Sequence, residues 1–252
     1  MRPFVQYYDA IYSDKNYRAD ADILRGLMKG VAQPSVLEIG SGTGNQSLRL
    51  CEWAEVTAVE TDADFASVMR KKCAAHPAIT LFEGDIAQLP AKNFDGAAAY
   101  FHVVNYIHDA KALAHLFTEI AKRLKQGAAL LFDMWHAECV LSDPPRDTTR
   151  TKAFDNTIGT GDVTQIIKPE LDAAKRNVTL NYSISIEGIA GTISFKTGPF
   201  TETIHLHLWQ QDEIVSALQN AGFTNINFFD GRNYPQAATQ QSWALWITAS
   251  KA

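Results

Sequence analysis

The chain has 252 residues and is 46% hydrophobic, so it is long enough for one sizeable core and too short for two independent enzymatic domains. Its formal net charge of −5 and the lack of a dense Lys and Arg cluster disfavour a nucleic-acid partner, because the field of the protein repels a phosphate backbone. Three cysteines without metal-ligand spacing, Cys51, Cys73 and Cys139, fit neither a disulfide framework nor a structural zinc site.

The first 17 residues carry several aromatic side chains, among them Tyr8, Tyr12 and Tyr17, together with Lys15. An amphipathic packing segment has this pattern, but aromatic faces and hydroxyls also suit a sulfonium and a carboxylate. The segment has no apolar signal stretch, and no run of about 18 apolar residues occurs elsewhere. We therefore expect a cytoplasmic protein with no membrane partner.

A glycine-rich turn follows the first predicted strand, 35–40, which lies between helices predicted over 18–30 and 45–53. The strand and turn contain Glu38, Gly40, Ser41, Gly42, Thr43 and Gly44. Glycine permits positive φ and lets the backbone approach a ligand, and the helix after it directs free N–H groups at the site. The spacing departs from G-x-G-x-x-G, which disfavours NAD or FAD.

The next two strands, predicted over 55–60 and 78–82, each lead to an acidic residue. Glu60 lies twenty residues after Gly40, where doubly wound folds place a carboxylate on ribose hydroxyls, and Thr61 follows it. Asp85 and Ile86 follow the later strand. Asp62 or Asp64 suits the N-terminus of the helix predicted over 64–74.

Strands predicted over 94–100 and 128–134 end in residues suited to an acceptor site, because open α/β sheets bind ligands at their carboxyl edges. These residues lie in 100–106, with Phe101 and His102, and in 133–136, with His136. Either histidine can take a proton near neutral pH, and either can instead be a packed residue with no proton role. A helix is predicted over 109–125, with Gln126-Gly127 as its C-cap.

The rhythm changes from about residue 137, and residues 162–209 form long runs rich in Thr, Ile and Val, which predict an antiparallel insert of three strands with turns near 171–175 and near Gly188 and Gly191. His205-x-His207 places two rings on one strand face, but without a third ligand we predict no metal site. A helix over 212–222 and strands over 223–229 and 242–249 return the chain to the core.

The run Glu38-x-Gly40-x-Gly42-x-Gly44, with Glu60 and Asp85–Ile86 in register behind it, resembles the motifs of class I S-adenosylmethionine-dependent methyltransferases. The resemblance implies a doubly wound, seven-stranded, mostly parallel sheet of Rossmann-like type with the antiparallel β insert. It also implies S-adenosylmethionine as the cofactor, with its methionine half on the glycine turn. The implied cofactor-binding residues are Tyr8, Tyr12, Lys15, Tyr17, Glu38, Gly40, Ser41, Gly42, Thr43, Gly44, Glu60, Thr61, Asp85, Ile86, Phe101 and His102.

The aromatic N-terminal run is similar to the segment that precedes the core in small-molecule N-methyltransferases, including the glycine and nucleotide-linked aminosugar branches. Metal-dependent catechol-type relatives show an Asp-Asn pair where this chain has Asp133-Met134, and base-modifying relatives show Pro-Pro and an aromatic where it has His102-Val103-Val104. We therefore expect methyl transfer to an amine or hydroxyl of a small polar metabolite, with an aminosugar as the narrower prediction.

The expected organisation is a methyltransferase core of residues 1–136 and 209–252 and a substrate lid of residues 137–208. Tyr12, His102 and His136 are the catalytic candidates, and placement of the acceptor is the main catalytic device. A small-molecule substrate is the expected partner, and a homodimer is the oligomer considered. Two alternatives remain open: a catalytically silent scaffold that binds the cofactor, and a nicotinamide-dependent oxidoreductase, which has the glycine spacing against it.

Overall fold

The computed structural model describes all 252 residues and divides into two compact units. The core unit comprises Asn16–Asp143 and His207–Ala252, and the β unit comprises Met1–Lys15 and Pro144–Leu206. The first fifteen residues thus group with the β unit, whereas the sequence placed them with the core. None of the helices is both long and apolar enough to cross a membrane.

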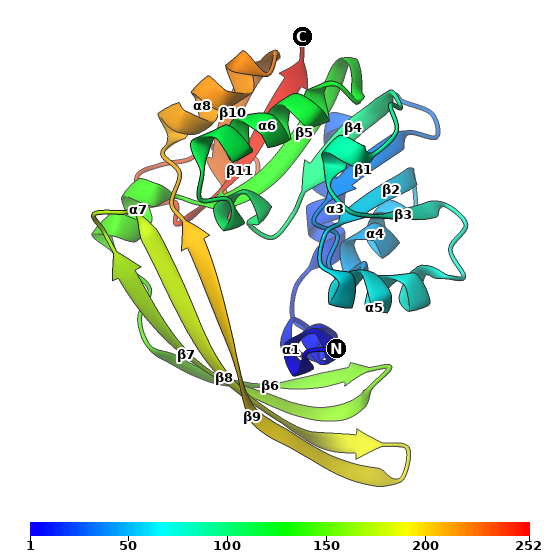
Figure 1. Cartoon of the computed structure of the whole chain (residues 1–252), viewed down its shortest axis with the longest axis vertical. Helices are drawn as coiled ribbons and strands as arrows, with labels where there is room; N and C mark the ends of the chain where they lie inside the picture. Colours follow the sequence, from blue (N-terminus) through cyan, green and yellow to red (C-terminus); the bar gives the residue numbers. More distant parts are fainter. The chain divides into compact units, whose positions relative to one another are not determined.

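The core unit is built on a seven-stranded sheet with the order β10-β11-β5-β4-β1-β2-β3 (Figure 1). Its strands are β1 (Ser35–Ile39), β2 (Glu55–Glu60), β3 (Ile79–Glu83), β4 (Phe94–Ala99), β5 (Leu124–Trp135), β10 (Phe223–Asp230) and β11 (Ala244–Lys251). The first five run parallel, and β11 runs antiparallel to both β5 and β10. The expected doubly wound, mostly parallel sheet is confirmed.

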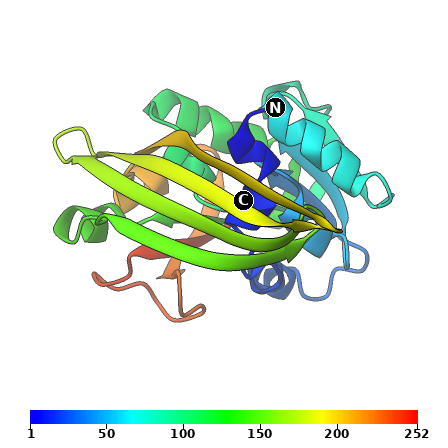
Figure 2. The ribbon, with the colours of Figure 1, turned by 90° about the horizontal axis from the view of Figure 1, so that it is seen from below.

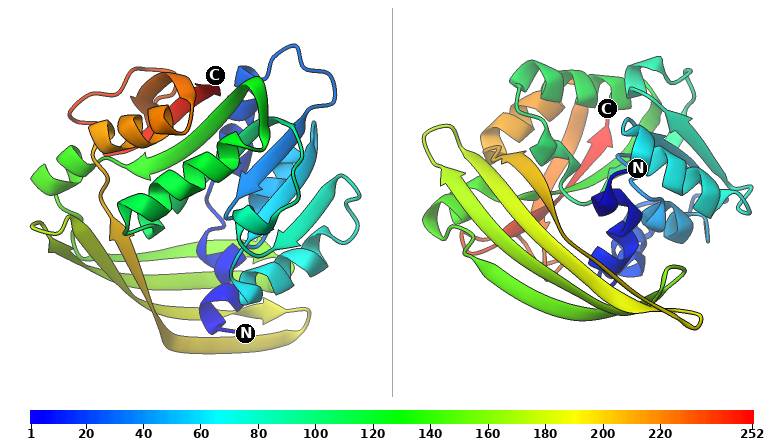
Figure 3. Two further views of the ribbon diagram at one scale, coloured as in Figure 1. Left: turned by 45° about the horizontal axis from the view of Figure 1, so that its top comes forward. Right: turned by 60° about the horizontal axis from the view of Figure 1, so that its bottom comes forward.

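Helices cover both faces of this sheet, as Figures 1 and 3 show. They are α3 (Tyr17–Leu27), α4 (Asn45–Leu50), α5 (Ala63–Cys73), α6 (Ala110–Ala121), α7 (Ala137–Ser142) and α8 (Gln211–Asn220), with short 3₁₀ turns η1 (Ile86–Gln88) and η2 (Val103–Tyr106). Leu37 packs with apolar residues of α6 and α8, whereas its neighbour Val36 packs with those of α3, α4 and α5. Successive strand residues therefore bury two different helix layers.

Local signals explain most helix boundaries. Asp62 caps α5 and accepts hydrogen bonds from the amides of Asp64 and Phe65, which selects it over Asp64 as the N-cap. The predicted C-cap at Gln126-Gly127 is wrong. Helix α6 ends at Ala121 and β5 already begins at Leu124, so Gly127, at φ +76°, lies in the strand, where the register with β4 shifts.

The β unit is an antiparallel sheet with the order β6-β7-β8-β9, seen face-on in Figure 2. Its strands are β6 (Thr148–Asn156), β7 (Gly159–Asp172), β8 (Asn177–Ala190) and β9 (Ile193–His207). The prediction of three strands is wrong because β6 is an exposed, polar edge strand with no apolar alternation to reveal it. The helical turns α1 (Pro3–Gln6) and α2 (Tyr8–Ile11) pack on this sheet, where Phe4 lies 6.3 Å from Tyr182 between ring centres.

Candidate active site

The turn from β1 to α4 is shaped by three glycines with positive φ. Gly40, Gly42 and Gly44 have φ of +68°, +57° and +84°. A Cβ at Gly40 would lie 2.7 Å from a methyl carbon of Val103, and one at Gly44 would lie 2.9 Å from the sulfur of Cys73. The first and third glycines are therefore required by the packing of the protein itself.

Gly42 differs from its two neighbours because a Cβ built on it meets no atom within 4 Å. The backbone there faces open space. Its N–H is oriented by Glu60 at the end of β2, since the Gly42 amide donates to Glu60 Oε2 at 2.7 Å. This is the opening that a ligand lying on the glycine turn requires.

The two carboxylates that the sequence singled out at the ends of β1 and β2 are both buried. Glu60 is 7% exposed, and its second oxygen accepts a 2.8 Å hydrogen bond from the Asp62 amide. Each carboxylate oxygen has two acceptor sites, so the backbone donors of Asp62, Gly42 and Thr61 leave Glu60 one lone pair for a ligand hydroxyl. Burial raises the pKa of Glu60, while its hydrogen bonds from the Asp62, Gly42 and Thr61 backbone partly offset the rise.

Glu38 lies one strand away and accepts a short hydrogen bond from the Ser47 hydroxyl. It is only 2% exposed, and this burial, with the nearby negative charge of Glu60 added, raises the pKa of Glu38 to about 8. Ser41 and Thr43 are also buried in the turn. A cationic ligand beside these carboxylates would favour their charged form, so the turn is electrostatically suited to a positively charged molecule.

The loop after β3, which carries Asp85, is fixed by a side chain from another part of the core unit. Asp85 caps η1 through the Ala87 amide at 2.7 Å, and Ile86 is buried behind it, while Thr61 and Asp85 are exposed. The buried Arg123 donates to the carbonyls of Leu89 at 2.6 Å and Ala87 at 3.2 Å. The loop that presents Asp85 is thus fixed by a guanidinium that follows α6.

At the end of β4, Phe101 and His102 both have positive φ, +70° and +63°, which side chains rarely adopt. Asp133 on β5 stabilises this backbone, since one of its oxygens accepts from the Phe101 amide at 2.5 Å and the His102 amide at 3.1 Å. Its other oxygen lies 2.8 Å from His102 Nδ1, which is within ion-pair distance but outside hydrogen-bond geometry, because the buried Nδ1 has no hydrogen-bond partner. Asp133 therefore holds the backbone of His102 and lies beside its ring.

Comparison with known proteins agrees with this geometry. Residues 36–127 match the family model described as a methyltransferase domain. They run from β1 into β5 and include the glycine turn, Glu38, Glu60, Asp85 and the His102 backbone. Residues 36–127 form a methyltransferase domain. The resemblance to class I S-adenosylmethionine-dependent methyltransferases is confirmed, and S-adenosylmethionine is the cofactor of that family.

Curated relatives match only parts of the chain. A ribosomal RNA small subunit methyltransferase A of Synechococcus is 43% identical over 68 residues, which are 27% of this chain and 24% of that protein. A putative methyltransferase of Geobacillus is 25% identical over 137 residues, 52% of this chain and 56% of that protein. The chain therefore spans little more than half the length of these relatives at most.

Solved structures share the fold across both units. DesVI of Streptomyces venezuelae matches with a TM-score of 0.75 and 17% identity over 100% of both chains. CalS10 of Micromonospora echinaspora is an amino pentose methyltransferase solved with bound S-adenosylmethionine. It matches with a TM-score of 0.71 and 16% identity over 97% of this chain and 96% of its own. The sugar N-methyltransferase KedS8 of Streptoalloteichus matches with a TM-score of 0.73 and 17% identity over 97% of this chain and 92% of its own.

His136, the third catalytic candidate, lies just beyond the methyltransferase domain with both ring nitrogens engaged. It is 2% exposed, its Nδ1 lies 2.8 Å from the Ser242 carbonyl oxygen, and its Nε2 lies 3.0 Å from the amide nitrogen of Gln211. The carbonyl oxygen can only accept, so Nδ1 donates to it, while the Gln211 side chain occupies Nε2. These contacts support a packing role, and the catalytic role of His136 stays a prediction.

The N-terminal candidates fall in different units. Tyr17 begins α3 next to the methyltransferase domain, and its carbonyl accepts a 3.0 Å hydrogen bond from the Gln46 side chain in α4. Tyr8, Tyr12 and Lys15 belong to the β unit, where the rings of Tyr8 and Tyr12 lie 4.6 Å apart. Their expected contact with the cofactor therefore stays a prediction.

The sequence did not identify the roles of Asp133 and Asn105. Asn105 is completely buried, and its side chain donates to the His207 carbonyl at 2.7 Å and accepts from the Trp135 amide at 3.0 Å. An acid and an amide at the ends of buried strands are the available signal, but only the folded chain shows that Asp133 supports a strained backbone.

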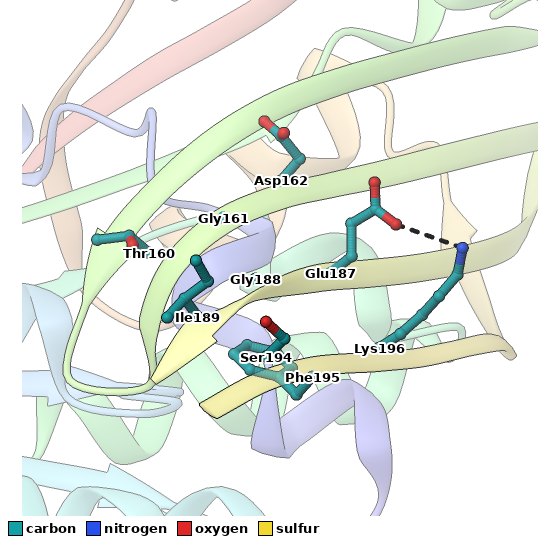
Figure 4. Close-up of a pocket in the computed structure, with 9 residues that line it drawn as sticks. All are labelled: Thr160, Gly161, Asp162, Glu187, Gly188, Ile189, Ser194, Phe195 and Lys196. Atoms are coloured by element: carbon teal, nitrogen blue, oxygen red, sulfur yellow. Dashed lines mark ion pairs between the residues drawn. The ribbon is translucent and has the colours of Figure 1, made fainter. Parts of the chain in front are cut away.

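A hollow of about 610 Å³ lies in the β unit among the ends of β7, β8 and β9 (Figure 4). Gly161 and Gly188 face each other there, and a Cβ on either would lie within 2.5 Å of the neighbouring backbone. The ion pair of Glu187 and Lys196, 3.3 Å apart, crosses its surface. None of its lining residues is a predicted site residue. No group of three or more metal-ligating side chains gathers in the chain.

Proposed function

We propose that the protein transfers the methyl group of S-adenosylmethionine to an amine of a small polar metabolite, with an aminosugar as the narrower acceptor class. The observation that carries the proposal is the open space above Gly42, whose amide is held by the Glu60 carboxylate at 2.7 Å. That opening lies within the methyltransferase domain, and it is bounded by buried carboxylates suited to a sulfonium cation and to ribose hydroxyls.

The choice of a sugar amine is supported by the extent of the structural matches. CalS10 and KedS8, named as amino pentose and sugar N-methyltransferases, match 97% of this chain, so the match includes the β unit. The ribosomal RNA enzyme matches 27% of the chain. A net charge of −5 also disfavours RNA, because the unscreened field opposes the approach of phosphates.

The proposed chemistry needs little covalent assistance. The sulfonium of the bound cofactor supplies an electrophilic methyl group, and S-adenosylhomocysteine leaves as the neutral thioether. The acceptor amine must present a lone pair, so an ammonium has to lose its proton first. His102 Nε2, with Nδ1 toward Asp133, is the group that we assign to take that proton.

The test is formation of S-adenosylhomocysteine, followed by mass spectrometry, with three acceptor sets: nucleotide-linked aminosugars, small amino acids and ribosomal RNA. We expect turnover with amine-bearing small molecules and none with RNA. Turnover on RNA alone contradicts the small-molecule proposal. Binding of S-adenosylhomocysteine without turnover on any acceptor favours the silent scaffold instead.

His102→Asn is the companion variant. Asparagine removes the titratable ring, so we expect the acidic limb of the pH–rate profile to change while cofactor affinity stays within about twofold. An unchanged profile excludes His102 as the proton acceptor and leaves alignment as the sole catalytic device. His136→Asn is the control for a buried histidine, and we expect it to lower stability without moving the profile.

A further inference from the structure

A row of paired residues from three strands lies on one face of the β-unit sheet. It is the face on which α1 and α2 pack. Arg150 on β6 is in register with Gln165 on β7, and Gln165 is in register with Ile184 on β8. Cross-strand partners point to the same side of a sheet, so these side chains form one row. Gln165 and Ile184 are fully buried, whereas Arg150 is exposed.

Gln165 is an amide with one end engaged and the other end unsatisfied. Its oxygen accepts a 2.7 Å hydrogen bond from Arg150 Nε. A guanidinium only donates, so the amide oxygen must face Arg150, and this fixes the orientation of the group. The amide nitrogen is buried and has no hydrogen-bond partner, although Gln165 is 0% exposed. Buried donors are almost always paired, so this N–H indicates a missing acceptor.

Arg150 presents further unsatisfied donors at the same place. Its one side-chain hydrogen bond uses Nε, so the edge formed by Nη1 and Nη2 remains free of protein partners. That edge is a planar fork that matches two oxygens of a carboxylate or phosphate. Gln165 holds the guanidinium from its Nε side, which lowers the entropy lost when an anion binds.

The charged groups around Arg150 leave a net positive charge. Lys152, the next residue on this face of β6, makes a short ion pair with Asp14. Lys152 Nζ also lies 5.9 Å from the ring centre of Tyr12. Asp14 interacts electrostatically with Arg150 as well, so the two cations and this one carboxylate together carry one positive charge.

We propose that Arg150 and Gln165 form an oxyanion-binding site in the β unit, which takes a phosphate or carboxylate group of a small anionic ligand. Two oxygens of the anion accept from the Nη1–Nη2 edge of Arg150, and the same anion approaches the amide nitrogen of Gln165.

The experiment titrates inorganic pyrophosphate, and separately acetate, into the 252-residue chain and measures the affinity by calorimetry at fixed ionic strength. Arg150→Gln removes the fork. Gln165→Glu keeps the side-chain shape but pairs with Arg150 and adds a negative charge. We expect each variant to bind the anion at least about tenfold more weakly. Pyrophosphate binding indicates a phosphate, and acetate binding alone indicates a carboxylate.

Lys168→Gln is the matched control because it removes one positive charge from the opposite face of β7, where the side chain is exposed. We expect no change in affinity beyond about twofold. Equal losses in Lys168→Gln and Arg150→Gln overturn the site, because they reveal general attraction between charges. Failure of the unmodified chain to bind either probe at millimolar concentration also overturns it. Equal thermal melting of all variants excludes unfolding as the cause.

The site and the proposed function can fail separately, because this titration needs neither the cofactor nor methyl transfer. Arg150→Lys keeps the charge without the fork and is expected to recover part of the lost affinity.

Discussion

At Gly42 the absent side chain leaves space that no other atom of the protein fills, unlike at Gly40 and Gly44. Gly42→Val puts a branched side chain into that space and into a backbone with φ +57°. We expect loss of S-adenosylhomocysteine binding by calorimetry, together with a stability cost of about 1–2 kcal/mol from the left-handed conformation.

Gly30→Val is the control for this substitution. Gly30 also has positive φ, +96°, and a Cβ there likewise meets no atom within 4 Å, but the residue lies outside the glycine turn. We expect a comparable loss of stability with cofactor binding retained. If both variants bind like the parent, the cofactor does not lie on Gly42.

Glu38 makes a pH-dependent contribution to stability. Its pKa rises from 4.5 to about 8 on folding, so the folded chain keeps this proton where the unfolded chain has lost it. The free energy of unfolding should therefore fall as pH increases through that interval, by at most about 1.4 kcal/mol per pH unit for one proton. Glu38→Gln should flatten this slope in urea unfolding curves recorded from pH 5 to 8. The exposed Glu83→Gln should leave it unchanged, and an equal slope in both variants contradicts the assignment.

At the scale of elements, Arg123 joins α6 to the loop that carries Asp85 and Ile86. Its guanidinium pairs with Glu119 at 2.7 Å, and both side chains are 7% exposed. Arg123→Ala leaves the Leu89 and Ala87 carbonyls without this donor and Glu119 with only the exposed Lys122 as a cationic partner, so we expect a loss of about 3–5 kcal/mol in urea unfolding.

Lys122→Ala removes the second cation beside Glu119. The Lys122 side chain is 62% exposed, and its Nζ lies 2.6 Å from the Glu119 carboxylate. We expect a loss of no more than about 1 kcal/mol, since solvent already screens this pair. If the two substitutions cost the same, the buried guanidinium does not fix the loop.

The sequence predicted the five parallel strands of the core unit well because each is a mainly apolar run ending at a glycine, an acid or an aromatic. It failed where such signals are absent or ambiguous. Gly127 has the pattern of a helix C-cap, but its positive φ serves a strand irregularity, which only the register with β4 reveals. The edge strand β6 is polar on both faces over most of its length. The grouping of Met1–Lys15 with the β unit depends on contacts 140 or more residues away in sequence, such as Ser13 with Ala153.

The candidate site was predictable where a role depends on local sequence. The glycine turn and Glu38 follow from the resemblance of their motif and Glu60 from its spacing, and the structure brings them together at the ends of β1 and β2. Roles that depend on tertiary partners were not predictable. His102 and His136 look equivalent in sequence, yet one lies beside Asp133 and is partly exposed, whereas the other is enclosed by Ser242 and Gln211.

For the whole molecule, the two proposed ligands should protect different units from hydrogen exchange. S-adenosylhomocysteine should slow exchange in residues 40–47, 60–62 and 85–87 of the core unit. Pyrophosphate should slow it in residues 148–152 and 163–167 of the β unit. Hydrogen-exchange mass spectrometry of the intact chain tests both, since protection reports local opening. Protection by S-adenosylhomocysteine confined to the β unit contradicts the assigned cofactor site.

The buried amide of Asn105 ties together two segments that are far apart in the sequence. By bonding to both Trp135 and His207, it fixes the place where the chain leaves the core sheet and the place where it comes back. One substitution at this position therefore frees both junctions at once, whatever sequence lies between them.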